Sequence, residues 1–118
     1  MSITTNIHNE SLIRGDTFEH RITVKKTDET VKDITGATVR YTIRATSYEG
    51  SQVLQKMVGS GVVLTMPTQG ILDVTLSASD TAALSPKTVY VYDCEVTISG
   101  VVKTVQQGSL TVSGDISQ

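Results

Sequence analysis

Apolar and polar residues alternate along several stretches of this chain, and this alternation limits the possible folds more than any other feature. Residues 17–26 and 38–45 place most of their apolar or aromatic side chains on one face and polar side chains on the other. Residues 89–99 repeat the pattern, with two tyrosines, Cys94 and two β-branched residues on one face. A repeat of two residues is that of a β-strand with one buried face. The three stretches are therefore predicted to be strands.

Turn residues separate these stretches from weaker strand signals. Pro67-Thr68-Gln69-Gly70 suits a four-residue hairpin turn between strands at 62–66 and 72–76. Further strands are expected at 53–58 and 101–107, and a last one includes Leu110 and Val112. Gly108, which precedes this last strand, is expected to form a bulge or kink.

One segment, residues 77–85, is typical of a helix. Ser79 can cap its first turn, Asp80 favours its positive end, and Pro86 follows shortly after it. We therefore expect one or two helical turns near Ser79–Ser85, crossing between sheets.

The composition favours an all-β fold. The 118 residues include 18 threonines, 15 valines and 9 isoleucines, which suit pleated, half-buried surfaces. We expect an immunoglobulin-like β-sandwich of about seven to nine antiparallel strands with the one short helical crossover. Residues 14–118 would form this single domain, and residues 1–13 an N-terminal arm.

Charge and hydropathy argue against several partners. The formal net charge is -2 and the basic residues are scattered among acids, so nucleic acid is not expected as a partner. The longest apolar runs span a few residues, far short of the roughly 20 that cross a bilayer, so no membrane partner is expected. The amino end, MSITTNIHNE, does not have the pattern of a signal peptide. Cys94 is the single cysteine and has no partner for an internal disulfide.

The tripeptide Arg14-Gly15-Asp16 is the sequence that some adhesive proteins present on a mobile loop. Here it runs straight into the alternating stretch that begins at Thr17. Gly15 can supply the backbone conformation that turns the chain into a sheet, and Asp16 can bond nearby backbone. The tripeptide is therefore interpreted as the start of a strand.

No set of residues in the sequence predicts catalysis. The two histidines, His8 and His20, are far apart in sequence and on different elements, which argues against a zinc site. Cys94 falls among inward-facing residues and is assigned to the core. The acidic residues Asp73, Asp80, Asp93 and Glu95 are assigned to solvated surfaces, and Ser79 and Ser85 have no Gly-x-Ser-x-Gly context. We therefore expect no catalytic residues, metal or cofactor, and no enzymatic activity.

Two segments are candidates for binding a partner. The N-terminal arm, with Ile3 and Ile7 as anchors, can add to the sheet edge of a neighbour, although a frayed terminus explains it equally well. The weakly patterned segment from Tyr48 to Val58 suggests an edge strand, with Tyr48, Val53 and Leu54 as its candidate contacts.

The order of several motifs resembles a group of small tailed-phage proteins. The motifs are RGDTF, DITGATVRYTIR at 33–44, GILDVTLSASDTAALSP at 70–86, and VYVYDCEVTISGVVKTVQQGSLTVSGDIS at 89–117. Together they are similar to the amino-terminal domain of the phage baseplate upper protein family, over nearly the whole chain from Arg14. In that family this kind of domain fixes the protein to the phage tail.

The resemblance implies a non-enzymatic structural or attachment component of a tailed-phage virion at the tail, baseplate or neck. Such a component would be made in the cytoplasm of the bacterial host and would bind neighbouring virion proteins in many copies, as a homo-oligomer or ring. A head decoration protein is the alternative within this class. A carbohydrate-binding or adhesion module for a host surface is the alternative from another class, for which Tyr48 is the one aromatic residue not assigned inward.

Overall fold

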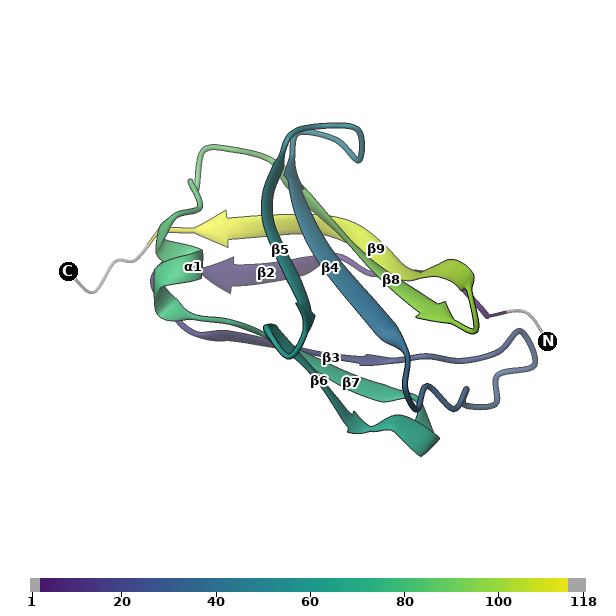
Figure 1. Ribbon diagram of the computed structural model, residues 1–118. Helices are drawn as coiled ribbons and strands as arrows, with labels where there is room; N and C mark the ends of the chain where they lie inside the picture. The colour runs from purple at the N-terminus through teal and green to yellow at the C-terminus, as the bar shows by residue number, and fades with distance from the viewer. Residues whose placement is uncertain (1–2, 115–118) are drawn as a thin grey trace.

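The chain consists almost wholly of β-strands in a computed structural model that describes residues 3–114 (Figure 1). Residues 1–2 of the expected arm and 115–118 of the expected domain lie outside the described residues. The strands are β1 (Asn6–Ile7), β2 (Glu10–Ile13), β3 (Phe18–Thr23), β4 (Thr38–Ala45), β5 (Gln52–Val58), β6 (Gly61–Met66), β7 (Ile71–Leu76), β8 (Tyr90–Ile98) and β9 (Val101–Ser113). A 3₁₀ turn, η1 (Pro67–Gln69), and a short helix, α1 (Ala78–Ala82), complete the fold.

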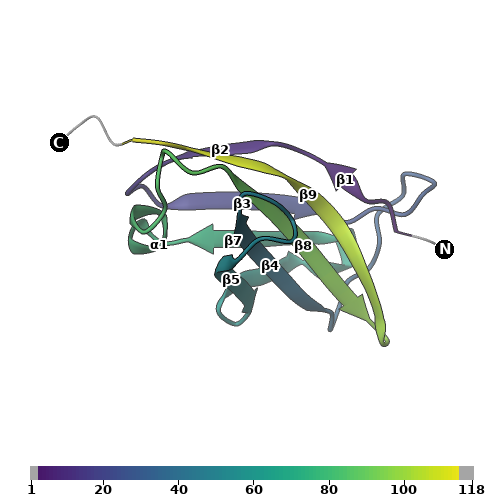
Figure 2. The same ribbon diagram turned by 90° about the horizontal axis from the view of Figure 1, so that it is seen from above.

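The strands form one mixed sheet in the order β1-β9-β8-β4-β5-β6-β7-β3, and β2 also pairs with β9. The pairs of β9 with β1 and β2 are parallel, as is the short pair of β5 with β6. The sheet curls into a half-barrel, so that β3, at one end of the order, lies near β2, which pairs with β9 near the other end (Figures 1 and 2). A seam without strand pairing therefore separates β2 from β3 in the described part of the chain.

The structure confirms the all-β class, but it does not divide into two antiparallel sheets. The connection at Gly59 and Gly61 explains this difference, because both glycines have positive φ angles, 88° and 98°. They make a turn so tight that Met57 and Val58 still pair with Gly61 and Val62. Strand pairing therefore connects β5 to β6, and the strands form one curled sheet.

The predicted inward faces of the central strands form the core. Tyr41, Ile43, Tyr92 and Cys94 are completely buried. The rings of Tyr41 and Tyr92 stack with their centroids 5.4 Å apart. Burial of an aliphatic side chain such as that of Ile43 contributes about 1.5–3 kcal/mol to the free energy of unfolding. The alternation on β4 and β8 therefore supplies part of the core that stabilises the fold.

The segment expected as an arm is instead an edge of the same sheet. Figure 2 shows β1 and β2 running alongside β9, and Leu12 is buried in the core. Gly108 is not a bulge: it pairs regularly with Tyr92, and the register shift between β8 and β9 falls between Cys94 and Glu95. A Cβ at Gly108 would lie 2.1 Å from the carbonyl oxygen of His8. This glycine is therefore needed for the close approach of the N-terminal edge.

The helix begins earlier than its sequence suggests. Ser77, not Ser79, is the N-cap: its hydroxyl accepts a hydrogen bond from the backbone N–H of Asp80, 3.1 Å away. The carboxylate of Asp80 accepts one in return from the N–H of Ser77 at 2.9 Å. This reciprocal arrangement satisfies two N–H groups at once, which favours Ser77 over Ser79 as the cap.

Candidate interaction surface

The Arg14-Gly15-Asp16 segment connects β2 to β3 and is fastened to α1. Gly15 has a φ of 90°, as the expected turn requires, and its N–H donates to the hydroxyl of the buried Thr81 at 3.0 Å. That hydroxyl donates to the carbonyl of Asp16 at 2.8 Å, and Arg14 Nε donates to the carbonyl of Leu84 at 3.1 Å. Because both its backbone and its arginine are held, the segment does not have the form of a mobile adhesive loop.

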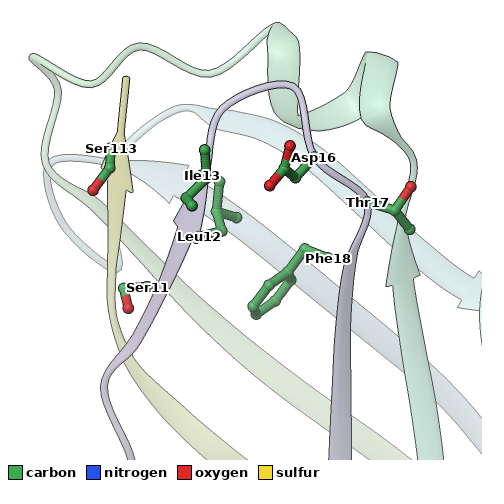
Figure 3. Close-up of a pocket in the computed structure, with 7 residues that line it drawn as sticks. All are labelled: Ser11, Leu12, Ile13, Asp16, Thr17, Phe18 and Ser113. Atoms are coloured by element: carbon green, nitrogen blue, oxygen red, sulfur yellow. The ribbon is translucent and has the colours of Figure 1, made fainter. Parts of the chain in front are cut away.

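An open pocket of about 320 Å³ lies beside this turn, in the seam between β2 and β3 (Figure 3). Its lining consists of Ser11, Leu12, Ile13, Asp16, Thr17, Phe18 and Ser113. Figure 3 shows Phe18 reaching across the gap towards Leu12, and the carboxylate of Asp16 at the rim. The lining has one carboxylate, three hydroxyl side chains, and neither histidine nor cysteine.

A buried polar cluster lies further along the seam. Nδ1 of His20 is 3.0 Å from the hydroxyl of Tyr41, and Nε2 is 2.9 Å from the amide nitrogen of Gln106. The same amide donates to the hydroxyl of Tyr92 at 3.0 Å. Because the Gln106 nitrogen is a donor, Nε2 of His20 must accept and Nδ1–H must donate to Tyr41. Burial lowers the pKa of His20, more than the charge of Glu10 raises it.

The fold brings both histidines to one carboxylate, which the sequence did not indicate. Nδ1 of His8 lies 2.5 Å from Oε2 of Glu10, and Nε2 of His20 lies 3.8 Å from Oε1. No group of three or more His, Cys, Asp or Glu side chains within residues 3–114 has an arrangement that could hold a metal ion. A pocket of about 280 Å³ opens beside His20. The cluster joins the N-terminal edge to β3 and is assigned a structural role.

The structure shifts the pKa of Cys94 and of two acidic residues, Asp73 and Asp93. The thiol of Cys94 is buried, and this burial raises its pKa to about 12. Burial and the charge of Glu95 raise the pKa of Asp93, and the guanidinium of Arg21, 2.9 Å away, lowers that of Asp73. A nucleophile requires a depressed pKa or an adjacent base, and Cys94 has neither.

An exposed apolar surface lies where the chain passes from β5 to β6. We call it the β5–β6 edge surface, and its exposed members are Val53, Met57, Val58, Val63 and Met66. Strand β5 pairs with β4 on one side over 52–57, but with β6 on the other side only at Met57 and Val58. Within the described part of the chain, residues 52–56 therefore have an open edge. Open edges with apolar side chains are sites of strand pairing between chains.

The five predicted contact residues differ in how far their side chains are exposed to solvent. Ile7 is 75% exposed, Tyr48 42% and Val53 46%. Ile3 and Leu54 are partly buried against the core, and Ile3 also pairs with Lys26, so both are poorly placed for a partner.

Met57, which is 44% exposed, lies within the segment 48–58 that the sequence indicated, whereas Val63, which is 61% exposed, lies outside it. An apolar residue at an outward position of an alternating strand was the available signal for Val63.

Comparisons with known proteins identify no family for this chain. No protein-family model matches the sequence, and no curated protein matches it. None of the helices described in residues 3–114 is long and apolar enough to cross a membrane.

Proposed function

We propose that this protein is a non-enzymatic structural or attachment component of a tailed-bacteriophage virion. It acts at the tail, baseplate or neck and binds neighbouring virion proteins in many copies. The observation that carries the proposal is the open edge of β5, flanked by the apolar β5–β6 edge surface. Such an edge binds a partner through backbone hydrogen bonds, and its exposed side chains supply specificity.

The curled sheet is also compatible with the expected immunoglobulin-like sandwich. We infer that β1, β2, β9, β8, β4 and β5 correspond to one sheet of that fold, and β6, β7 and β3 to the other. The parallel contact at Met57 and Val58 would then be the bridge between the two sheets. The motif resemblance to baseplate upper proteins supports the same assignment.

Weak contacts suit a component that is repeated on a symmetric platform. An edge of five residues makes a small interface, and small interfaces are usually weak. Many copies on one particle would raise the effective concentration and so the overall affinity. A head decoration protein would use the same edge on the capsid lattice, and the position in the particle separates the two roles.

The test is a survey of purified phage particles made by a host that expresses this protein. Quantitative mass spectrometry would measure the copy number, and immunogold labelling would locate the protein. We expect a few to a few tens of copies at the tail end. Hundreds of copies over the head would instead show decoration, and absence from the particle would reject both roles. Glycan arrays would then test the host-surface module, for which Tyr48 is the exposed aromatic residue.

A further inference from the structure

Strand β3 is the last strand of the sheet order, and within residues 3–114 it pairs with a strand, β7, on one side only. The N–H of Val24, just after β3, donates to the carbonyl of Gly70 at 2.7 Å, on the side of β7. The carbonyl of Lys25 accepts from the N–H of Thr4 at 2.9 Å, on the side away from β7. Because these directions alternate along an antiparallel strand, the odd-numbered residues of β3 direct their backbone groups away from β7.

The open side of β3 is regular and accessible at Glu19 and Arg21. The pairing of β3 with β7 continues without a register shift over 18–23. Both side chains are exposed, and a pocket of about 280 Å³ that they help to line opens beside them. Within the described part of the chain, the N-terminal segment pairs with this side at Lys25 and Lys26, beyond the end of β3. The backbone groups of Glu19 and Arg21 can therefore bond to another strand.

We infer that β3 pairs with β3 of a second copy of this chain, antiparallel and across a two-fold axis at His20. In this register Glu19 faces Arg21 of the second copy, and the two residues exchange their N–H and C=O hydrogen bonds. The two-fold axis repeats this pair. The surface is separate from the β5–β6 edge surface, and the inference goes beyond the proposed function and does not depend on it.

The charges of β3 are complementary in this register and in neither neighbouring one. Glu19 and Arg21 lie on the outward face, so each row across the axis joins opposite charges. A shift by two residues in one direction would place Glu19 against Glu19, and in the other direction Arg21 against Arg21. Charges on an edge otherwise oppose strand pairing. Here they select one register of a pair of identical strands.

The guanidinium of Arg21 can bind a second carboxylate. Its Nε and Nη2 donate to the carboxylate of Asp73 on β7, at 2.9 and 3.0 Å. Arginine has five N–H donors, so those of Nη1 are left for Glu19 of the second copy. In the dimer one row would therefore contain Asp73, Arg21 and the second Glu19, side by side on three strands.

The inner face of β3 is also compatible with this register. Phe18 would lie opposite Ile22 of the second copy, and both side chains are apolar and packed in or against the core. Only about five residues per copy would meet, which is typical of weak or transient interfaces. We therefore expect a reversible dimer at high protein concentration. Because the charged rows lie at the surface, salt at about 1 M should weaken it.

Mixed disulfide trapping tests the register directly. Glu19→Cys and Arg21→Cys are oxidised mildly, each alone and as an equimolar mixture. In the inferred register the thiols of the two variants face each other, within the range of a disulfide. Thiols at equal positions are offset by two residues along the strands, beyond the roughly 7 Å limit between Cα atoms. We expect the mixed dimer, identified by its mass, to form at least about tenfold faster than either dimer of a single variant.

The native cysteine does not interfere, because Cys94 is completely buried. Charge reversal gives a second test by sedimentation velocity. Glu19→Lys alone and Arg21→Glu alone should each weaken the dimer by about tenfold, because like charges then meet in both rows. Their equimolar mixture should dimerise again, because both rows of a mixed dimer join opposite charges. Glu49→Lys is the matched control, since Glu49 is an exposed carboxylate away from β3. Circular dichroism would show that the variants remain folded.

Disulfides that form as fast in Glu19→Cys alone as in the mixture would overturn the inferred register. A chain that stays monomeric at millimolar concentration and forms no mixed disulfide would overturn the dimer and leave the β3 edge to a strand of another protein. Both tests use the purified full-length chain. Their result is therefore separate from the presence or absence of the protein in phage particles, which tests the proposed function.

Discussion

Replacement of Gly108 by alanine should loosen the N-terminal edge of the sheet. The added Cβ would lie 2.1 Å from the carbonyl oxygen of His8 and 2.7 Å from its carbonyl carbon. These are backbone atoms, so the segment between β1 and β2 must move. The backbone of Gly108 is not in the left-handed region, and alanine would otherwise be acceptable there. The close approach of His8 alone therefore makes the substitution unfavourable.

The size of the effect follows from the contacts that the movement would break. The hydroxyl of Tyr92 donates to the carbonyl of His8 at 2.6 Å, and the N–H of His8 donates to the carbonyl of Gln107 at 2.8 Å. The N–H of Ser109 donates to the side chain of Asn9 at 3.1 Å. Three such bonds contribute about 1.5–4.5 kcal/mol. The reduced entropy of the unfolded chain offsets about 0.4–1 kcal/mol of this loss.

We therefore expect Gly108→Ala to lower the free energy of unfolding by about 2 kcal/mol, and Tm by roughly 6–12 °C. Urea denaturation followed by circular dichroism would measure the first quantity. Hydrogen exchange should become faster in the amides of β2 before those of β4. Gly114→Ala is the matched control, because a Cβ at Gly114 would meet nothing within 4 Å. Stability of Gly108→Ala equal to or above that of the unmodified chain would refute the reasoning.

Three further predictions concern the helix cap, the buried histidine and the cysteine. Ser77→Ala should destabilise the protein by about 1 kcal/mol and Ser79→Ala by less than about 0.5 kcal/mol, and equal effects in urea denaturation would contradict the observed cap. Burial lowers the pKa of His20 from its ordinary value of 6.5, so the stability that neutral His20 contributes is present above pH 6.5 and is lost as pH falls towards the lower folded pKa. In His20→Gln the free energy of unfolding should change less between pH 7.5 and 5 than in the unmodified chain. An unchanged slope would show that other groups cause the pH dependence. Because burial raises the pKa of Cys94 to about 12, iodoacetamide should not modify it in the folded protein at pH 8, whereas rapid alkylation without unfolding would show that the thiol is accessible.

Local patterns predicted much of the secondary structure. The strand expected at 38–45 is β4, and the hairpin around Pro67 and Gly70 is present with Gly70 at a φ of 73°. The inward assignment of Tyr41, Tyr92 and Cys94 is confirmed by their complete burial. These features depend on a repeat of two residues or on one turn, which neighbouring residues specify by themselves.

The choice of the helix cap could also have been made from the sequence. Ser77-Ala78-Ser79-Asp80 contains the Ser-x-x-Asp spacing of a capping box, whereas Ser79 has no acidic residue three positions later. The cap therefore lies three residues before Asp80, not next to it. The role of Gly108 has no such local signal, because the atom that excludes a Cβ belongs to His8.

The sequence by itself determined which segments are strands, which faces are apolar and where the chain turns. Only the tertiary structure decided which strands pair, because pairing joins residues that are far apart in the chain. It placed the N-terminal edge beside β9 and brought His8 and His20 to Glu10. Within residues 3–114 it also left residues 52–56 of β5 without a partner strand on one side. Strand pairing and the closure of a curled sheet depend on the packing of the whole core, and a local period of two residues contains no information about either.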